Sequence, residues 1–438
     1  MNGISRRQLG VVSGALLLSS VSESRALERN PFGGVLKIRV PWAIEALDPD
    51  ALGDPLSAAF LPFVTETLYA RNGATLFPTL TEALPKVEQG LARVTLRPGL
   101  RAANGAKFLA VHALQSLERA RRGPAMGLFA EWQDLSVDPA AERTLLIRTP
   151  APDQVADILA CAASRMTEAN FSPKKHRGLG AFTAEIAGRR LVLSRNLSAP
   201  RGPAYLDSIV VERADSLGDA LSAFEAGDSA VGWFGKGLYR PRAGAIPFSA
   251  GSLGWVVLRS HAGLGRWGAP GVLQALLDGT DLTKLGHVGI VGEPPRAARG
   301  FWGGPPTTLL VDTACSQLVE AAQVMAGTLS QPGHELLVKR VSKTEIERAS
   351  ATREPALSLE FVRALGSKGE HMLVTLLAAQ NPKLALHPPK LKVNAAREVA
   401  LTLPLGVVGE LKLRGACDAR FVNLERFELA DVWWREPI

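Results

Sequence analysis

One stretch of the sequence, residues 178–228, constrains the fold more than any other. Apolar residues at 191–193 and a β-branched run at 209–211 predict two strands. A loop rich in Pro and Gly at 198–203 separates them, because these residues interrupt any helix. Apolar residues then recur at helical spacing from Leu217, and a Gly ends the predicted helix at position 227. Strands that alternate with a helix in this way predict an α/β fold.

The residues of this stretch resemble the bacterial extracellular solute-binding proteins of family 5, the oligopeptide, dipeptide and nickel receptors of ABC importers. In that family a G-x-G-x-Y/F strand precedes an h-V-L-x-R-N strand, a G-x-P-x-L-D-x-I-V strand and a helix ending A-L-x-A-G-E-h-D. The matching residues here are Gly178, Gly180, Phe182, Val192, Leu193, Arg195, Asn196, Gly202, Pro203, Leu206, Asp207, Ile209, Val210, Ala226, Gly227 and Asp228. The aromatic pair that follows the Asn in the family is replaced by Ala199 and Pro200.

Other landmarks follow in the family's order. Gly33-Gly34 before a strand, Leu47-Asp48-Pro49, and Leu96-Arg97-Pro98-Gly99 are similar to its opening motifs, and Leu429 to Trp433 is similar to its closing D-L-x-D-V-W-L. The resemblance implies a two-lobed, periplasmic-binding-protein-like α/β fold of type II, with a ligand cleft between lobes that close about a hinge. We expect lobe I over residues 27–240, lobe II over 241–398 and a return to lobe I over 399–438. Within them the sequence predicts a helix from Phe60 to Tyr69, a helix over 155–163 and strands over 253–258 and 399–403.

The first residues have the pattern of an export signal. Arg6 and Arg7 precede an apolar run from Val11 to Leu18, and Ser24-Arg25-Ala26 offers small residues for cleavage. The run is too short for an ordinary membrane span. The paired arginines resemble the twin-arginine export motif, although the general secretory route remains an alternative. We therefore expect a signal peptide over residues 1–26 and a soluble, periplasmic mature protein.

Composition excludes some classes of function and leaves the thiol state open. The formal net charge is +8, but the Lys and Arg residues are scattered and lack the interleaved aromatics of a nucleic-acid-binding surface. Three cysteines, Cys161, Cys315 and Cys417, are too few and too far apart for a metal knuckle or a disulfide scaffold. One disulfide with one free thiol and three buried thiols both remain possible.

The resemblance also suggests where a ligand would bind. Peptide receptors of the family carry W-x-A-D-Y-P-D-P, whose Asp pairs with the peptide's amino terminus, and residues 356–364 occupy that place without the motif. Glu360 either replaces this Asp, or Glu360 and Arg363 are surface charges. The candidate cleft residues are Asp54, in the loop before the first predicted helix; Trp255, at the lobe crossing; Glu360 and Arg363; and the aromatics Trp42 and Trp233, near strand ends.

No pattern of catalytic residues is found in the sequence. It lacks a G-x-S-x-G elbow, an H-E-x-x-H motif and a Walker loop, and its seven His residues are isolated. We expect a monomeric binding protein without enzymatic activity, cofactor or metal ion, which delivers a peptide-like or other small solute to an ABC permease. A diverged periplasmic sensor or scaffold protein, and an enzyme exported by the twin-arginine route, remain alternatives.

Overall fold

The computed structural model describes residues 32–168, 171–233, 243–261, 263–352, 354–366, 368–389 and 395–434. The signal predicted over residues 1–26 lies outside these ranges. Residues from Phe32 onward form one compact unit.

A five-stranded mixed sheet contains the stretch that resembles the solute-binding proteins. Its order is β1-β11-β10-β9-β8, with bounds Val35–Val40, Ser208–Arg213, Arg190–Arg195, Phe182–Ala187 and Lys175–His176. The parallel pairing of β1 with β11 brings the first strand beside one that follows it by about 170 residues, as Val35 faces Ser208. Helix α5 (Leu217–Ala226) starts at the cap Ser216 and ends at Gly227, whose φ of 87° favours glycine. The predicted strand-loop-strand-helix order is confirmed.

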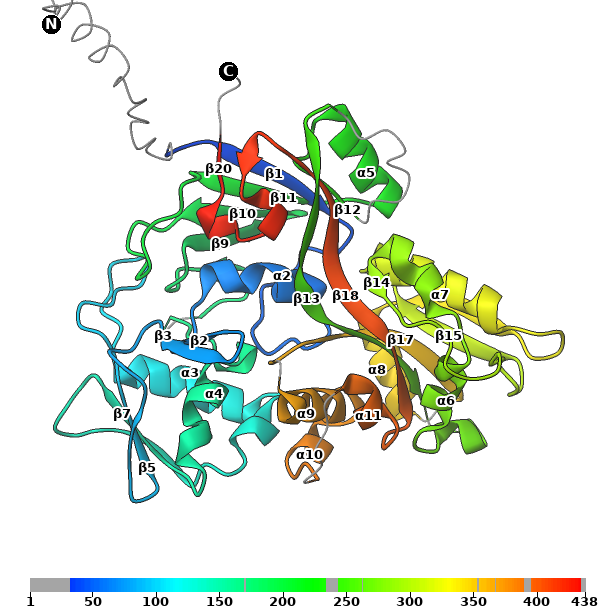
Figure 1. Ribbon diagram of the computed structural model, residues 1–438, viewed down its shortest axis with the longest axis horizontal. Coiled ribbons are helices and arrows are strands. Elements are labelled where there is room, and N and C mark those ends of the chain that lie inside the picture. Colours follow the sequence, from blue (N-terminus) through cyan, green and yellow to red (C-terminus); the bar gives the residue numbers. More distant parts are fainter. Residues whose placement is uncertain are drawn as a thin grey trace, which may run out of the picture. The chain divides into compact units, whose positions relative to one another are not determined.

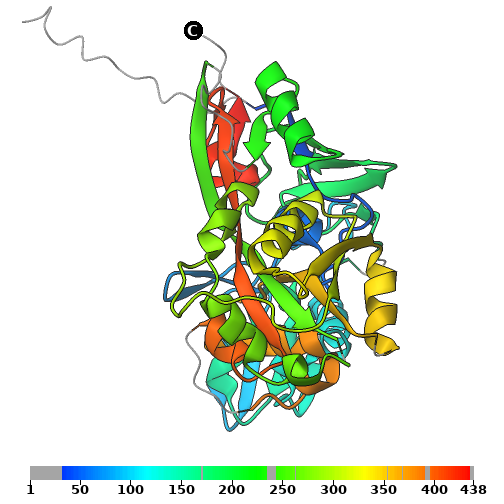
Figure 2. The same ribbon diagram turned by 90° about the vertical axis from the view of Figure 1, so that its right-hand side faces the viewer.

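A second, seven-stranded sheet is built on two long strands. Its order is β12-β18-β13-β17-β15-β16, with β14 also paired to β18. The bounds are Val231–Trp233, Leu405–Asp418, Ala245–Ser260, Ala356–Arg363, Thr307–Asp312, Leu336–Val341 and, for β14, Ile290–Val291. Strands β13 and β18 run antiparallel side by side, with the first sheet on one side of them and β15, β17 and α7 (Ser316–Leu329) on the other (Figures 1 and 2).

Smaller elements cover these sheets. A four-stranded sheet has the order β4-β5-β7-β6, and β2 pairs with β3 and β19 with β20. Their bounds are Lys86–Glu88, Leu91–Thr95, Thr144–Arg148, Asp134–Val137, Tyr69–Asn72, Thr75–Pro78, Phe421–Val422 and Trp433–Trp434. The remaining α-helices are α2 (Pro55–Val64), α3 (Ala110–Arg122), α4 (Val155–Leu159), α6 (Val272–Asp278), α8 (Lys343–Ala351), α9 (Gly369–Gln380), α10 (Pro382–Ala385) and α11 (Ala396–Ala400).

The long strand β13 contributes to two apolar clusters at once. Val256 and Leu258 belong to the cluster that contains β1 and α7, whereas Trp255 and Val257 belong to the cluster that contains α3 and α9. Successive side chains of a strand point to opposite faces, so a continuous apolar run along β13 buries both faces. The predicted strand over 253–258 is confirmed, and it lies at the centre of the second sheet.

Three details differ from the sequence-based expectation. Residues 399–403, predicted as a strand, form the end of α11 and a following turn, and β18 starts only at Leu405. The predicted helix ending at Tyr69 stops at Val64, because Tyr69 is the first residue of β2 and pairs with Pro78 of β3. The helix predicted over 155–163 stops at Leu159 and continues as a short 3-10 turn. Cys161, Cys315 and Cys417 are all buried and free, which agrees with the alternative of three buried thiols.

Candidate functional site

A cavity of about 600 Å³ lies where the loop before α2 meets the second sheet. Four segments and one strand end line it: residues 42–55, 312–318, 342–347 and 359–361, together with Arg213 at the end of β11. Strands β15, β16 and β17 run parallel to one another, and the cavity opens beyond the carboxyl ends of β15 and β16. In open α/β sheets this edge is the usual place for a ligand, since the loops there are free to vary without disturbing the sheet.

The lining of this cavity, which we call the acidic cavity, carries more acids than bases. Its lining contains six carboxyl side chains and two basic ones. The acids are Glu45, Asp48, Asp54, Asp312, Glu347 and Glu360, and the bases are Arg213 and Lys343. The N-termini of α2, α7 and α8 also contribute to the lining, and each adds a partial positive charge of about 0.5. Three such ends offset less than half of the surplus of four acids. The cavity therefore favours a ligand with a positive charge.

Asp54 is held in place because it caps a helix. Its carboxylate accepts hydrogen bonds from the backbone N–H of Leu56 and Ser57, both at 3.0 Å, and Pro55 occupies the first helical position. Burial raises the pKa of Asp54 above its ordinary value, and its hydrogen bonds to Ser57 and Leu56 and the charge of Lys343 oppose this shift. The sequence predicted an acidic residue in the loop before this helix. In the structure the same residue caps the helix, so its carboxylate has a fixed position.

Asp312 lies at the end of β15 and was missed by the sequence analysis. Its Oδ1 accepts a hydrogen bond of 2.9 Å from the backbone N–H of Ala314. Burial raises its pKa, and the hydrogen bond from Ala314 and the charge of Lys343 oppose the shift. Lys343, at the start of α8, is therefore close enough to bear on both Asp54 and Asp312. Asp312 ends β15 and Lys343 lies two residues after β16, so polar residues at the carboxyl ends of strands are the signal that could have found both.

Glu360 and Trp42 line the same cavity as Asp54 but are already partnered. Glu360 forms an ion pair of 2.7 Å with Arg259. The Trp42 side chain is almost fully buried, and its indole N–H donates to Oε1 of Gln317 at 3.1 Å. Trp42 also makes a backbone bridge to Cys315, which joins the loop of the first sheet to the start of α7. Three of the six predicted site residues are thus brought together.

Arg363 lies beside this cavity rather than in its lining. Its side chain is only 2% exposed, and its Nη1 donates to the carbonyl of Pro49 at 3.3 Å while its backbone N–H donates to that of Leu52 at 2.7 Å. Burial is the main cause that lowers its pKa, to about 9, and the neighbouring carboxylates of Asp54 and Asp50 partly oppose this. Arg363 therefore fastens the acid-bearing loop 48–54 to β17.

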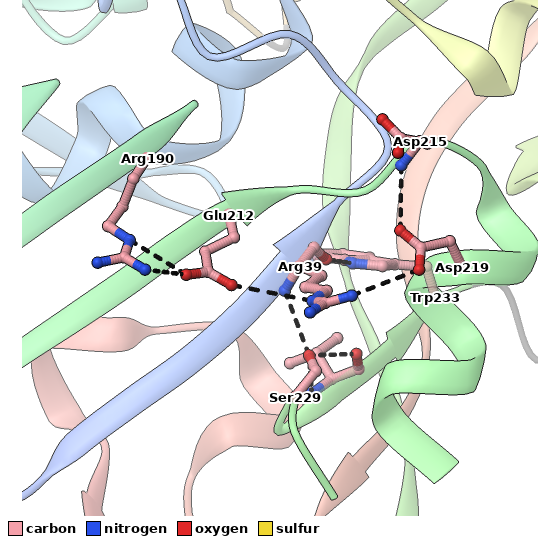
Figure 3. Close-up of polar contacts among 8 residues, drawn as sticks. Arg39, Arg190, Glu212, Asp215, Asp219, Ser229 and Trp233 are labelled. Atoms are coloured by element: carbon pink, nitrogen blue, oxygen red, sulfur yellow. Dashed lines mark hydrogen bonds and ion pairs between the residues drawn. The ribbon is translucent and has the colours of Figure 1, made fainter. Parts of the chain in front are cut away.

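Trp233 belongs to an apolar core and lies outside the lining of the acidic cavity. Its indole packs near Trp42, with ring centroids 5.7 Å apart, and its N–H donates to the backbone carbonyl of Arg39 (Figure 3). Arg39 in turn donates from its backbone to Ser229 at 3.2 Å and from its guanidinium to Asp219 at 3.3 Å. This network ties β1 to β12 and to the first turn of α5, and so supports the fold behind Trp42.

Trp255 lines a different, smaller cavity of about 300 Å³. It shares no lining residue with the acidic cavity. The lobe-crossing strand that was expected to bring Trp255 to the same cleft as Glu360 instead turns Trp255 towards α9 and α11. Whether any of the six predicted residues contacts a ligand stays a prediction.

A buried Cys-His pair elsewhere lacks the charges of a nucleophile. The sulfur of Cys161 lies 3.4 Å from each ring nitrogen of His371. Burial raises the pKa of the thiol to about 12 and lowers that of the imidazole to about 4. Both groups are neutral near pH 7, whereas a reactive cysteine needs a depressed pKa. The pair therefore acts as a packed contact between the segment after α4 and helix α9.

The described ranges of the chain contain no group of three or more His, Cys, Asp or Glu side chains placed to hold a metal ion. No helix within them combines the length and the apolar character needed to cross a membrane.

The fold matches solved structures closely, although the sequence is distant from them. The periplasmic binding protein DppA from Helicobacter pylori, in complex with peptide STSA, aligns with a TM-score of 0.71 at 15% identity over 94% of this chain and 100% of that one. The oligopeptide-binding protein AppA from Bacillus subtilis, in complex with a nonapeptide, has a TM-score of 0.70 at 12% identity over 93% and 100%. NikA from Staphylococcus aureus, in complex with Ni(L-His)2, has a TM-score of 0.70 at 12% identity over 92% and 100%.

This chain has the two-lobed α/β fold of the periplasmic binding proteins. The fold predicted from the resemblance is therefore confirmed. Neither the scan of protein-family models nor the search of curated proteins finds a match to the sequence. The likeness thus rests on three-dimensional structure at low identity.

Proposed function

We propose that this chain is an exported solute-binding protein that captures a small, positively charged solute, such as a peptide with a free amino terminus. In this proposal the protein works as a monomer in the periplasm and delivers its ligand to the permease of an ABC importer. The predicted lobe boundaries fit this proposal, since 240/241 and 398/399 fall shortly before β13 and β18, the two long strands of the second sheet.

The acid surplus of the cavity is the observation that supports the proposal most directly. An ammonium group that enters it would meet Asp54 and Asp312, whose pKa values burial raises because no full counter-charge compensates them. A bound cation would supply that counter-charge. Hydrogen bonds between charged groups contribute about 1.5–3 kcal/mol each, enough to select an amine over a neutral group.

The role of Asp54 and Asp312 can be separated from their role in the fold. At Asp312 the carbonyl oxygen of Asn can accept the backbone hydrogen bond from Ala314. At Asp54 it can accept the bond from Leu56, while the amide nitrogen takes the place of the oxygen that accepts from Ser57. The variants Asp54→Asn and Asp312→Asn therefore remove the charge and keep at least one backbone hydrogen bond each. Asp228→Asn, at the exposed end of α5, is the matched control.

The test begins with native mass spectrometry of the mature protein, residues 27–438, purified from its own periplasm. We expect a bound small molecule or peptide pool that is released on denaturation. Trialanine should then raise the melting temperature of the emptied protein, and N-acetyl-trialanine should not. The double variant Asp54→Asn with Asp312→Asn should bind trialanine at least about tenfold more weakly, and Asp228→Asn should bind it normally.

Two results would count against the proposal. An empty protein whose melting temperature is unchanged by peptides, sugars and amines would favour the sensor or scaffold alternative. Equal binding of trialanine and its acetylated form would reject the acidic cavity as the site of amine recognition.

A further inference from the structure

The smaller cavity is built from elements that are far apart in the sequence. Helix α6, the segment 291–296, helices α9 and α11, and the strands β13 and β18 all contribute to its lining. Its apolar wall includes Leu277, Met372 and Val407, which leave room for a hydrocarbon side chain. The volume of about 300 Å³ is half that of the acidic cavity. A ligand here would be smaller than one in the acidic cavity.

Trp255 supplies the first sign that this cavity is made for a ligand. Its side chain is only 7% exposed, yet its indole N–H donates to no protein atom within the described part of the chain. The indoles of Trp42 and Trp302 donate to Gln317 and to the carbonyl of Pro305, whereas the enclosed N–H of Trp132 has no partner within the described residues. The nitrogen of Trp255 differs from that of Trp132, because it is not fully enclosed and the space of the smaller cavity can reach it. An acceptor atom of a ligand inside the cavity would accept a hydrogen bond from the indole N–H of Trp255.

The charges around this cavity form the second sign, because they are balanced. Asp278 and Arg397 make a two-pronged ion pair with one contact of 2.8 Å, and Glu410 pairs with Lys412 at 3.2 Å. Glu293 and Arg296 form a third pair at 2.8 Å. The hydrogen bond from Arg397 is the main cause that lowers the pKa of Asp278, so this carboxylate stays ionised. Opposite charges therefore stand at the edge of one small, partly apolar space.

We infer that the smaller cavity is a second binding site, and that it takes a small zwitterion of the size and chemistry of a free amino acid. The carboxylate of such a ligand accepts the hydrogen bond of the Trp255 indole and faces Arg397. Its ammonium group faces the carboxylate of Glu410, and its side chain packs on Met372 and Val407. A zwitterion matches the balanced charges, whereas a simple cation or anion leaves one sign uncompensated.

The inference is independent of the proposed function, and the test keeps them apart. The indole N–H resonances of the full mature protein are recorded by NMR, and that of Trp255 is identified as the one lost in Trp255→Phe. The probes are L-leucine and its two singly charged analogues, isopentylamine and 4-methylpentanoate, each added up to about 10 mM. Trp267→Phe, which removes another buried indole away from both cavities, is the matched control.

We expect L-leucine to shift the Trp255 resonance saturably and both analogues to bind at least about tenfold more weakly. Trp255→Phe should weaken leucine binding about tenfold in calorimetry, while Trp267→Phe and the double variant Asp54→Asn with Asp312→Asn leave it unchanged. A Trp255 resonance that does not move would overturn the site. An analogue that binds as tightly as leucine would overturn the zwitterion class. Loss of leucine binding in the Asp54/Asp312 double variant would place leucine in the acidic cavity and overturn the second site.

Discussion

The two cavities differ in how their charges are compensated. The acidic cavity holds a surplus of carboxylates, with raised pKa values at Asp54 and Asp312, and depends on Arg363 beside it. The smaller cavity is surrounded by acids that each have a basic partner. Unpaired carboxylates favour the binding of a cation, but they lower the stability of the empty protein. Carboxylates that already have basic partners do not need a ligand to be stable.

Removal of Arg363 should have the largest effect on stability. Arg363→Met removes a buried positive charge that lies near Asp48 and Asp54, and it frees the loop from β17; Asp50 keeps its ion pair of 3.1 Å with Arg119. We expect a loss of about 3–5 kcal/mol in the free energy of unfolding, because a buried charge and the bond that anchors the loop are lost together. Urea unfolding monitored by circular dichroism measures this loss.

The control for this variant is Arg348→Met, on the exposed face of α8. Its guanidinium is 72% exposed and lies 4.0 Å from Glu345. We expect a change within about 0.5 kcal/mol. A loss below about 1 kcal/mol for Arg363→Met would show that the acids around it are compensated in another way.

The corresponding change at the smaller cavity should cost less. Arg397→Met removes the partner of Asp278, whose side chain is 13% exposed and still receives a hydrogen bond from Gln274. We expect a loss of about 1–2 kcal/mol by the same urea titration. Arg296→Met, at the exposed pair with Glu293, is the control and should lose less. A loss equal to that of Arg363→Met would erase the proposed contrast between the cavities.

Asp54 allows the cap to be separated from the charge. Asp54→Ala removes the acceptor for the backbone N–H of Leu56 and Ser57, and should lower the free energy of unfolding by about 1 kcal/mol. Asp54→Asn keeps the cap and should retain wild-type stability or exceed it, since it removes a buried charge. Thermal unfolding of both variants compares the two effects. Equal destabilisation would indicate that the charge, rather than the cap, holds this loop.

The sequence predicted the architecture far better than the cavities. The motif over residues 178–228 specified a local order of strands and turns. The spacing of apolar residues along the chain indicates such local structure directly. It could not report that β13 sends Val256 and Trp255 into different clusters, because that depends on which elements cover each face. The strand predicted over 399–403 was wrong for a related reason, as an apolar run of five residues fits a buried helix equally well.

The candidate site was predicted in part. Asp54 and Trp42 were chosen because they lie in a loop or near a strand end, and Glu360 because it occupies the place of the family's Asp motif; all three line one cavity. Lys343 and Asp312 were missed, although Asp312 ends β15 and Lys343 lies two residues after the end of β16. Trp255 was assigned to the same cleft because a strand crossing between lobes was treated as a single face. The face on which Trp255 lies depends on its pairing with Val362 of β17 and Glu410 of β18, and both residues are more than 100 positions away in the sequence.

The pH dependence of stability should give the smallest effect, with opposite sign for the two cavities. Burial raises the pKa of Asp54 and Asp312 above 3.8, so the folded protein binds these protons more tightly than the unfolded chain. Relative to the double variant Asp54→Asn with Asp312→Asn, the wild type should therefore gain stability as the pH falls from about 7 towards about 4. Asp278 has a lowered pKa, so its contribution is complete above 3.8 and is lost only as the pH falls further.

Urea unfolding of wild type, the double variant and Asp278→Asn at matched pH values measures both signs at once. On acidification, the free energy of unfolding of the wild type should approach that of the double variant. Below about pH 4, the wild type should no longer be more stable than Asp278→Asn. Because ligand cations need ionised carboxylates, trialanine binding to the acidic cavity should weaken over the first interval, before Asp278 is protonated. A parallel pH response of the two variants would mean that both sets of acids have the same environment, and the contrast between the cavities would then fail.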